Sequence, residues 1–442
     1  MRQYNSTFTG SEPFWANACV GENGSPGYWE YSKGFSQAAV ILIDLVLRTK
    51  GIKYSVDELI YPVCFNMRHS VELRLKGSIS ELIQLESYRS RNLIFDFSGS
   101  HNINNIWEFF KESAKKIDSR YDQIIERLNI KINDIAEIDA TGQTFRYPID
   151  TESRKHLVNV SVINFLVLKR SFTELEATLD ELHRLNTYLL EEYSWGSFTK
   201  KLSRRDLFEI ATLLPHRTTW TDKSFDTTRD TIKEKFGIGS KELSDAIEKI
   251  KSHFELAPEI GVELPLLGVT KDDIYEFVFH WFKLHELESD KAPVDLDAGE
   301  YYLDTCFDEI KKRSAIKQDV WHAVGSKITP EILAGLSALF YFARDLDFSE
   351  SYAHTYAIHL REARGKFAAS DNSSIRQDYF HIFEKSNAVY NILQSLYFLR
   401  QQEIADQLVA TYELDSKFSW LDKARTRSLF RKPDYCGYVI KA

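Results

Sequence analysis

Apolar residues in the first part of the chain recur every three or four positions, which is the spacing of one helical face. The clearest run lies within residues 28–50 and consists of Phe35, Ala39, Leu42, Leu45 and Val46. Gly51 follows directly, and glycine is favoured after the last turn of a helix because it adopts the left-handed conformation without strain. The pattern therefore predicts a helix over residues 28–50.

Three more helices are predicted before residue 195. The second covers residues 56–85, and the third starts within SGSHNINNIWEFFKESAKKI, where Ser100 or Asn102 is the expected N-cap. The fourth covers residues 156–193, after a connection that contains DATGQTFRYPID and is interpreted as non-helical from its glycine and proline. Four helices of about 20 to 35 residues in this order predict a four-helix bundle.

The remainder of the chain is also expected to be helical. Glycine (19) and proline (10) are scarce in 442 residues, and breaks are predicted near residues 237–239, 258–267 and 290–299. We therefore expect an all-α protein with a helix content above roughly 60%, about twice the globular average. The chain is too long for one ordinary core, so an N-terminal helical bundle of residues 1–195 and a second helical domain of residues 196–442 are predicted.

Net charge and cysteine usage narrow the classes of partner and site. The formal net charge of −9 argues against a broadly basic nucleic-acid-binding surface, although a local basic groove stays compatible with it. The four cysteines are far apart and form no CxxC pair, so no metal site and no cofactor are expected. The most apolar run, AAVILIDLVL, has about half the length of a membrane span, and the opening MRQYNSTFTGSEPFW lacks the apolar core of a secretion signal. We expect a cytoplasmic protein with no membrane segment.

The stretch YPVCFNMRHSVELRLKG places ionisable groups among the apolar residues of the second predicted helix. His69, Glu72 and Lys76 stand at positions i, i+3 and i+7, which lie on one helical face. Arg68 and Arg74 are expected to point elsewhere. Three interpretations are open: a solvated polar stripe, a buried network in which Glu72 fixes His69, and a functional site.

Two groups outside this helix are candidates to join it. His101 precedes the third predicted helix, and in a bundle the start of that helix would bring His101 toward His69 or Glu72, although an exposed loop histidine is an alternative. Arg146 stands in FRYPID between two aromatic residues, before a proline that restricts the loop. An arginine in such a place binds phosphate or a carboxylate, or forms a buried ion pair that anchors the loop.

Two basic clusters, KKLSRR and KARTRSLFRK, are candidates for contact with a nucleic acid. The second cluster contains Arg425 and Arg427 close to an interleaved phenylalanine. Phosphate contacts from such a patch would make binding strongly dependent on salt. The alternative is an ordinary charged surface with no specific role.

Four blocks in a fixed order resemble a known family. They are W-x-Y-x-x-G-F from Trp29 to Phe35, YPVCFNMRHSVELRLK, SHNINNIW and FRYPID. Together, over about residues 28–195, they resemble a helical group within the HEPN-like (higher eukaryote and prokaryote nucleotide-binding) proteins of prokaryotic toxin and phage-defence genes. The resemblance implies a helical bundle that often dimerises and has RNA as its usual substrate or ligand.

The resemblance implies that active members are metal-independent endoribonucleases, whose motif is an arginine, then four to six residues, then a histidine. The bundle lacks that spacing, and in the whole chain it occurs at Arg376 and His381. The bundle thus departs from the family's motif, and if it cuts RNA the candidates are the polar residues described above. They are His69 and His101 as base and acid, Glu72 as the group that orients a histidine, and Arg68 or Arg146 on the scissile phosphate.

The further RNA contacts expected on this basis are Lys76, Arg146, Arg425 and Arg427. Three functions are compatible with the sequence. The first is an RNA-targeting toxin or anti-phage effector that cuts RNA without a metal ion. The second is a non-catalytic module that binds RNA or a nucleotide, and the third is a helical interaction subunit of a defence complex. RNA and a protein partner or a second copy of the chain are the expected partners.

Overall fold

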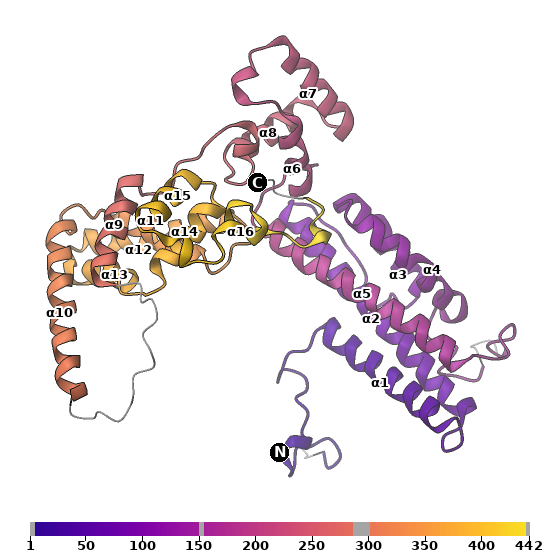
Figure 1. Cartoon of the computed structure of the whole chain (residues 1–442). Helices are drawn as coiled ribbons and strands as arrows, with labels where there is room; N and C mark the ends of the chain where they lie inside the picture. The colour runs from indigo at the N-terminus through magenta and orange to yellow at the C-terminus, as the bar shows by residue number, and fades with distance from the viewer. Residues whose placement is uncertain (1–4, 150–153, 286–300, 439–442) are drawn as a thin grey trace. The chain divides into compact units, whose positions relative to one another are not determined.

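The structure is a computed structural model that describes residues 5–149, 154–285 and 301–438, with side chains of residues 301–309 left aside. In these described residues there are sixteen α-helices and no β-strand, and the helix content is 67% (Figure 1). The all-α prediction is confirmed. None of the described helices combines the length and the apolar character that a membrane span requires. The predicted break at residues 290–299 lies outside the described residues.

The chain divides into two compact units, Met1–Ser194 and Trp195–Ala442. The helices of the first unit are α1 (Tyr28–Thr49), α2 (Val56–Tyr88), α3 (Ile103–Ile117), α4 (Tyr121–Asp139) and α5 (Phe165–Ser194). Helix α2 lies against α1, α3 and α5, so it is the central element of this unit. Its fully buried apolar side chains are Val63, Val71, Leu75, Ile79, Leu82 and Leu85.

The first unit therefore contains five helices within its described residues, where the sequence predicted four. The sequence predicted no helix directly after the third one. The structure has α4 there, separated from α3 by a short break. Arg120 stands in this break and donates from Nε to Asp118 (2.9 Å) and from Nη1 to Glu192 (3.0 Å). All three side chains are buried, so a buried ion-pair group fixes the turn between α3 and α4.

The start of the last helix of this unit also differs from the prediction. Helix α5 begins at Phe165, not at residue 156. Asn164 supplies the cap, because its Oδ1 accepts hydrogen bonds from the backbone N–H groups of Leu166 (2.9 Å) and Val167 (3.2 Å). An asparagine in this position satisfies donors that the helix itself leaves unpaired.

The second unit is built around two apolar cores. Its helices are α6 (Arg204–Leu213), α7 (Lys223–Phe236), α8 (Ser240–Lys251), α9 (Lys271–Leu284), α10 (Tyr301–Val324), α11 (Pro330–Phe342), α12 (Glu350–Ala368), α13 (Asn372–Phe383), α14 (Ala388–Phe398), α15 (Gln402–Thr411) and α16 (Leu421–Arg425). One core joins α6, α7 and α8, and the other joins α9 to α16. Gly237, with φ +60°, ends α7 in the predicted break at residues 237–239.

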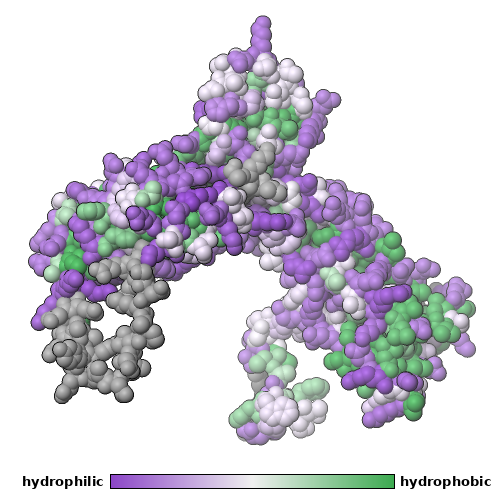
Figure 2. Space-filling view, in the orientation of Figure 1, coloured by the Kyte–Doolittle hydropathy of each residue, from purple (hydrophilic) through white to green (hydrophobic). Residues whose placement is uncertain are grey.

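Apolar side chains are exposed at one end of the first unit, where α1 ends and α2 and α5 begin (Figure 2). These residues are Ile52, Val56, Val158, Val162, Leu166 and Val167. Isolated exposed apolar residues are common, but a group of them on one end marks a surface that contacts something other than water. This end lies beside the loop of residues 144–149.

We expect replacement of Leu75 by Ala to lower the free energy of unfolding by about 2–5 kcal/mol, because it leaves a void in the central helix. Leu75 is completely buried. The matched control is Ile130→Ala on α4, where 70% of the residue is exposed and the expected change is within about 0.5 kcal/mol. Urea unfolding of the two variants and the parent, followed by circular dichroism, tests this. Equal effects of the two substitutions would contradict the placement of α2 at the centre.

A candidate site around Glu72

Three charged side chains lie in one row on the buried side of α2. Arg68, Glu72 and Lys76 are four positions apart, and this spacing places them one above the other on a helix. All three are buried. Burying a charge is costly unless it is paired and hydrogen-bonded, so the contacts of this row decide what it does.

The carboxylate of Glu72 is the centre of the group. Its Oε1 lies 2.9 Å from Lys76 Nζ and 3.0 Å from His101 Nδ1. Its Oε2 forms an ion pair with Arg68 and lies 3.8 Å from His69 Nδ1. One buried carboxylate therefore faces four nitrogen-bearing side chains.

The pKa of Glu72 is lowered well below its ordinary value. Burial by itself raises the pKa of this carboxyl group, but the nearby imidazole of His69, the contact with Lys76, the charge of Arg68 and a hydrogen bond with His101 more than offset this. Opposite charge and hydrogen bonds to the ionised form act in this direction. Glu72 is thus a carboxylate at neutral pH.

Arg68 connects three parts of the first unit. Besides its ion pair with Glu72, it donates from Nε to the carbonyl of Asp139 (3.2 Å) and from Nη2 to the carbonyls of Ala140 (2.9 Å) and His101. Gly142 gives the guanidinium its space, because a Cβ at this residue, which has φ +77°, would lie 3.1 Å from Nη1. Arg68 thereby ties α2 to the end of α4 and the start of α3.

The expectation that Arg68 points away from the row is wrong, because its spacing of four residues from Glu72 places both on the same side of the helix. Arg74 does point elsewhere. It forms an ion pair with Asp180 of α5, and its guanidinium carbon lies 3.8 Å from the ring centre of Trp29.

Lys76 is also engaged inside the fold. Its Nζ donates to the carbonyl of Phe97 (3.0 Å) in the segment between α2 and α3, in addition to its contact with Glu72. Because the side chain is buried, it does not stand at the surface as the expected RNA contact. Arg68, Glu72 and Lys76 together have the geometry of a buried network that holds connecting segments on α2.

The two histidines are the accessible members of the group. The exposed fraction is 30% for the His69 side chain and 63% for the His101 side chain. Each ring directs Nδ1 toward Glu72, so each Nε2 lies on the far side of its ring. His69 lies edge-on to Phe35 (4.5 Å between ring centres) and is stacked with Phe65 (5.7 Å).

Arg146 does not contact Glu72 but lies near His69. It is exposed, and its guanidinium carbon is 5.7 Å from the ring centre of Phe65, the ring that is stacked with His69. Tyr147 lies on another side of the guanidinium, at 5.3 Å. Of the two candidates outside α2, the structure therefore brings His101 to the carboxylate and places Arg146 one aromatic ring away from His69.

The basic cluster near the C-terminus does not present its two predicted arginines to a phosphate. Arg425 is paired with Asp406 (2.9 Å) and Asp415 (2.8 Å). The hydrogen bonds that Arg425 donates to Asp415 and Asp406 raise its pKa against the opposing effect of burial. Its charge is balanced within the fold, which corrects the expectation of an RNA contact.

Arg427 is buried, and this corrects the second expectation for the same cluster. Its Nη1 donates to the carbonyl of Tyr397 (3.0 Å), and the guanidinium lies over the rings of Phe398 and Phe430. Burial, followed by the nearby charge of Arg400, lowers the pKa of Arg427 to about 10. The side chain serves as a donor to backbone carbonyls and is not part of a basic surface.

The pair with the family's spacing, Arg376 and His381, lies in α13. His381 Nε2 is 2.9 Å from the hydroxyl of Tyr341. Arg376 lies over the rings of Trp321 and Phe380. Arg376 and His381 therefore have different contact partners. Both belong to the second unit, and Glu72 belongs to the first.

One group of potential metal ligands that no sequence spacing indicates lies in the second unit. It consists of His253, Glu255 and Glu350. Arg204 forms ion pairs with both carboxylates. The Nδ1 of His253 accepts the backbone N–H of Glu255 (3.1 Å), so the ring proton is on Nε2, which lies 3.0 Å from Glu350 Oε1. A protonated Nε2 is no metal ligand, and the geometry is that of a buried ion-pair network around Arg204.

Comparison of the chain with protein-family models, with curated proteins and with solved structures finds no match. The function of the chain is therefore inferred from the chemistry of the Glu72 site. Its chemical elements are an ionised buried carboxylate, two accessible imidazoles that face it, and an exposed guanidinium close to one of them.

We expect Glu72→Gln to lower the free energy of unfolding by about 3–5 kcal/mol, because Arg68 and Lys76 would stay buried without their counter-charge. The matched control is Glu108→Gln, which removes a pair with Lys111 in which 47% of the glutamate side chain is exposed. Its expected effect is below about 1 kcal/mol. Urea unfolding at neutral pH measures both. Equal effects would show that the Glu72 contacts contribute nothing beyond a surface pair.

The ionisation of Glu72 also predicts that the stability difference between the parent and Glu72→Gln depends on pH. The folded-state pKa of Glu72 lies below its ordinary value of 4.5, so the carboxylate stabilises the fold above that pH. Its contribution is lost as the pH falls from 4.5 through the folded-state pKa. The difference in unfolding free energy between the parent and Glu72→Gln should therefore be full near neutral pH and shrink progressively in acid. A difference that grows in acid would contradict the assignment.

Proposed function

We propose that the first unit is an RNA-directed HEPN-like module in which His69, Glu72 and His101 cut RNA without a metal ion, as part of a toxin or anti-phage effector. The observation that supports this best is that one ionised buried carboxylate faces the Nδ1 atoms of two accessible histidines. An arrangement of this kind orients each imidazole and leaves its Nε2 for substrate.

In the proposed reaction His101 is the base. Its Nδ1 is within hydrogen-bond distance of Glu72, at 3.0 Å, so Nδ1–H can donate to the carboxylate while Nε2 keeps a lone pair. Nε2 takes the proton of the ribose 2′-hydroxyl, and the oxygen attacks the adjacent phosphorus. His69, in its protonated form, delivers a proton to the 5′-oxygen as the bond to phosphorus breaks. The products are a 2′,3′-cyclic phosphate and a 5′-hydroxyl.

The scissile phosphate also requires a positive group at the surface. Arg146 is the candidate, because it is exposed and lies over Phe65, the ring that is stacked with His69. Arginine suits this task because its planar guanidinium can donate two parallel hydrogen bonds to phosphate oxygens. Arg68 is a weaker candidate, since its donors are already directed at backbone carbonyls.

The resemblance of about residues 28–195 to HEPN-like proteins supports RNA as the substrate. It also supports a second copy of the chain or a protein partner in a defence complex as the physiological context. The proposed site itself uses residues of a single chain. The cleavage step requires neither a metal ion nor a cofactor.

The alternative is a non-catalytic module that binds RNA or a nucleotide, or a helical interaction subunit. One observation favours it. Arg68 and Lys76 donate to the carbonyls of Asp139, Ala140 and Phe97, and these contacts are explained fully by a network that fixes connecting segments. In that case the two histidines would complete the network without reacting.

The test is cleavage of labelled single-stranded RNA by the purified full chain in EDTA. We expect the double variant His69→Ala/His101→Ala to lose at least about 100-fold in rate, the contribution typical of a general acid or base. The control double variant His322→Ala/His354→Ala, at two exposed histidines of the second unit, should cut like the parent. Circular dichroism verifies that all variants are folded.

Two outcomes would redirect the proposal. If the folded variant at His69 and His101 cuts like the parent, the Glu72 group is not the active site, and Arg376 with His381 is the next pair to replace. If the parent leaves RNA intact both in EDTA and in magnesium, the non-catalytic alternative takes precedence.

A further inference from the structure

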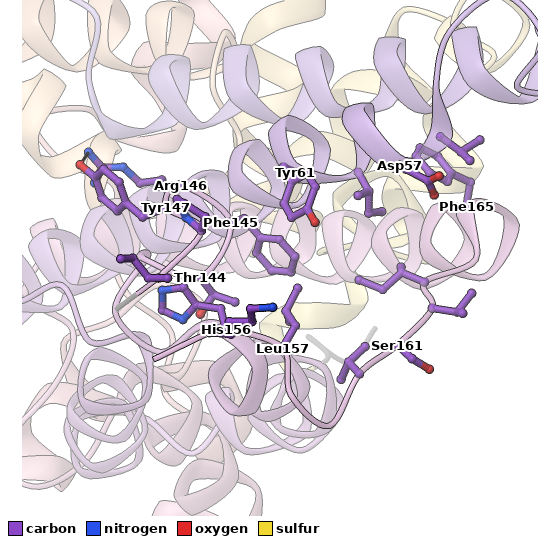
Figure 3. Close-up of a pocket in the computed structure, with 18 residues that line it drawn as sticks. Asp57, Tyr61, Thr144, Phe145, Arg146, Tyr147, His156, Leu157, Ser161 and Phe165 are labelled. Carbon is purple, nitrogen blue, oxygen red and sulfur yellow. Dashed lines mark hydrogen bonds between the residues drawn. The ribbon is translucent and has the colours of Figure 1, made fainter. Parts of the chain in front are cut away.

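A cavity of about 980 Å³ lies beside the FRYPID loop of the first unit. Its walls come from the start of α2, from the loop itself and from the segment that leads into α5 (Figure 3). This volume is at the upper end of the range of roughly 300–1,000 Å³ that is typical of small-molecule sites. The residues around Glu72 do not line it, so it is a separate site.

Aromatic rings and a histidine share the middle of this cavity. Tyr61, Phe145 and His156 point toward the same central space in Figure 3, with Arg146 at one end. Aromatic side chains that line a cavity offer flat faces on which a planar ring can stack, and a nucleobase is such a ring. Stacking of this kind tolerates different bases, since each has a flat π-face.

The charged and polar groups of the cavity indicate an anionic ligand. Among the described lining residues, Arg146 and Lys155 are basic and Asp57 is acidic. In addition, the Nε2 of His156 is buried and has no hydrogen-bond partner among the described residues. Because this atom has almost no accessible surface, the positive charges of Arg146 and Lys155 are the groups that an anionic ligand would meet.

We infer that this cavity binds one nucleotide unit. The base would stack on Tyr61 and Phe145, and the phosphate would be held by Arg146 and Lys155. A nucleobase with an attached phosphate is the shared chemistry of unpaired RNA and of a free mononucleotide. The inference rests on the proposed function to the extent that RNA is the physiological source.

Arg146 gives this cavity a role in choosing where RNA is cut. It lines the cavity and also lies over Phe65, which is stacked with His69. A phosphate at Arg146 is therefore shared between the nucleotide in the cavity and the histidine group. The base in the cavity would belong to a nucleotide next to the scissile bond. Since a paired base cannot leave its stack without cost, the site would select single-stranded RNA.

The experiment measures binding and not cleavage. The probes are a short single-stranded RNA with one 2-aminopurine base, the same RNA paired with its complement, and AMP as a competitor, all in EDTA. The full chain with His69→Ala/His101→Ala binds the probes without cutting them. Stacking on the cavity rings should quench the fluorescence of 2-aminopurine in the single-stranded probe and not in the duplex.

Two matched pairs of substitutions test the cavity. In the same background, Tyr61→Ala and Arg146→Ala should each weaken binding of the single strand by about tenfold, the size typical of one lost stacking or phosphate contact. The controls are Tyr31→Ala and Arg48→Ala, at exposed residues of α1 that do not line the cavity. These controls should bind the RNA like the unsubstituted background.

Displacement of the RNA by micromolar AMP would identify a free mononucleotide as the source, and tight binding of RNA alone would identify single-stranded RNA. Either result supports the nucleotide site. Binding that Tyr61→Ala and Arg146→Ala leave unchanged, or no binding of any probe, would overturn it. The readout is separate from cleavage, so a chain that binds without cutting would contradict only the proposed reaction.

Discussion

The first unit depends on one buried carboxylate and the two cations on either side of it in the same helix. Glu72 compensates Arg68 and Lys76, and these two cations direct their remaining donors at backbone carbonyls of the segments that flank α3 and α4. Carbonyls at helix ends and in loops need donors when water is excluded. The charged row thus satisfies polar backbone atoms that the apolar core could not, and it fixes loops on a central helix that packs on several sides.

This dependence explains how a structural network and the proposed reactive site can occupy the same place. A carboxylate that must stay ionised to hold Arg68 and Lys76 is also a permanent acceptor for the imidazoles beside it. The buried cations make the site rigid, while the exposed faces of His69 and His101 are the parts that a substrate can reach. Positioning of this kind, with reactive groups supported by buried ones, is what a site for proton transfer requires.

Local sequence patterns were sufficient for some of these features and not for others. Helical spacing predicted α1, α2 and the common face of His69, Glu72 and Lys76, because these depend only on neighbours within a few turns. The same spacing rule applies to Arg68. It lies four residues before Glu72 and therefore on the same side of the helix as Glu72 and Lys76. The cap at Asn164 was likewise a local signal for the start of α5.

Features that depend on distant partners could not be predicted in this way. The break between α3 and α4 is held by a contact between Arg120 and Glu192, which are 72 positions apart. Arginine is usually exposed, but Arg427 is buried and donates to the carbonyl of Tyr397 in α14. Helical periodicity does not indicate which loop a buried arginine contacts. Sequence patterns alone therefore predict that the basic clusters are exposed.

The ion pairs of Arg204 connect the two apolar cores of the second unit. Arg204 begins α6, in one apolar core, and Glu350 begins α12, in the other. The two cores are therefore joined at this point by charges and not by shared apolar packing alone. The charge of Arg204 counters the effect of burial and keeps the pKa of Glu350 well below its ordinary value. Glu255, the second carboxylate paired with Arg204, also has a pKa below its ordinary value. The contact between the two cores therefore rests on two ionised glutamates that share one buried arginine, and acid that neutralises them would weaken it.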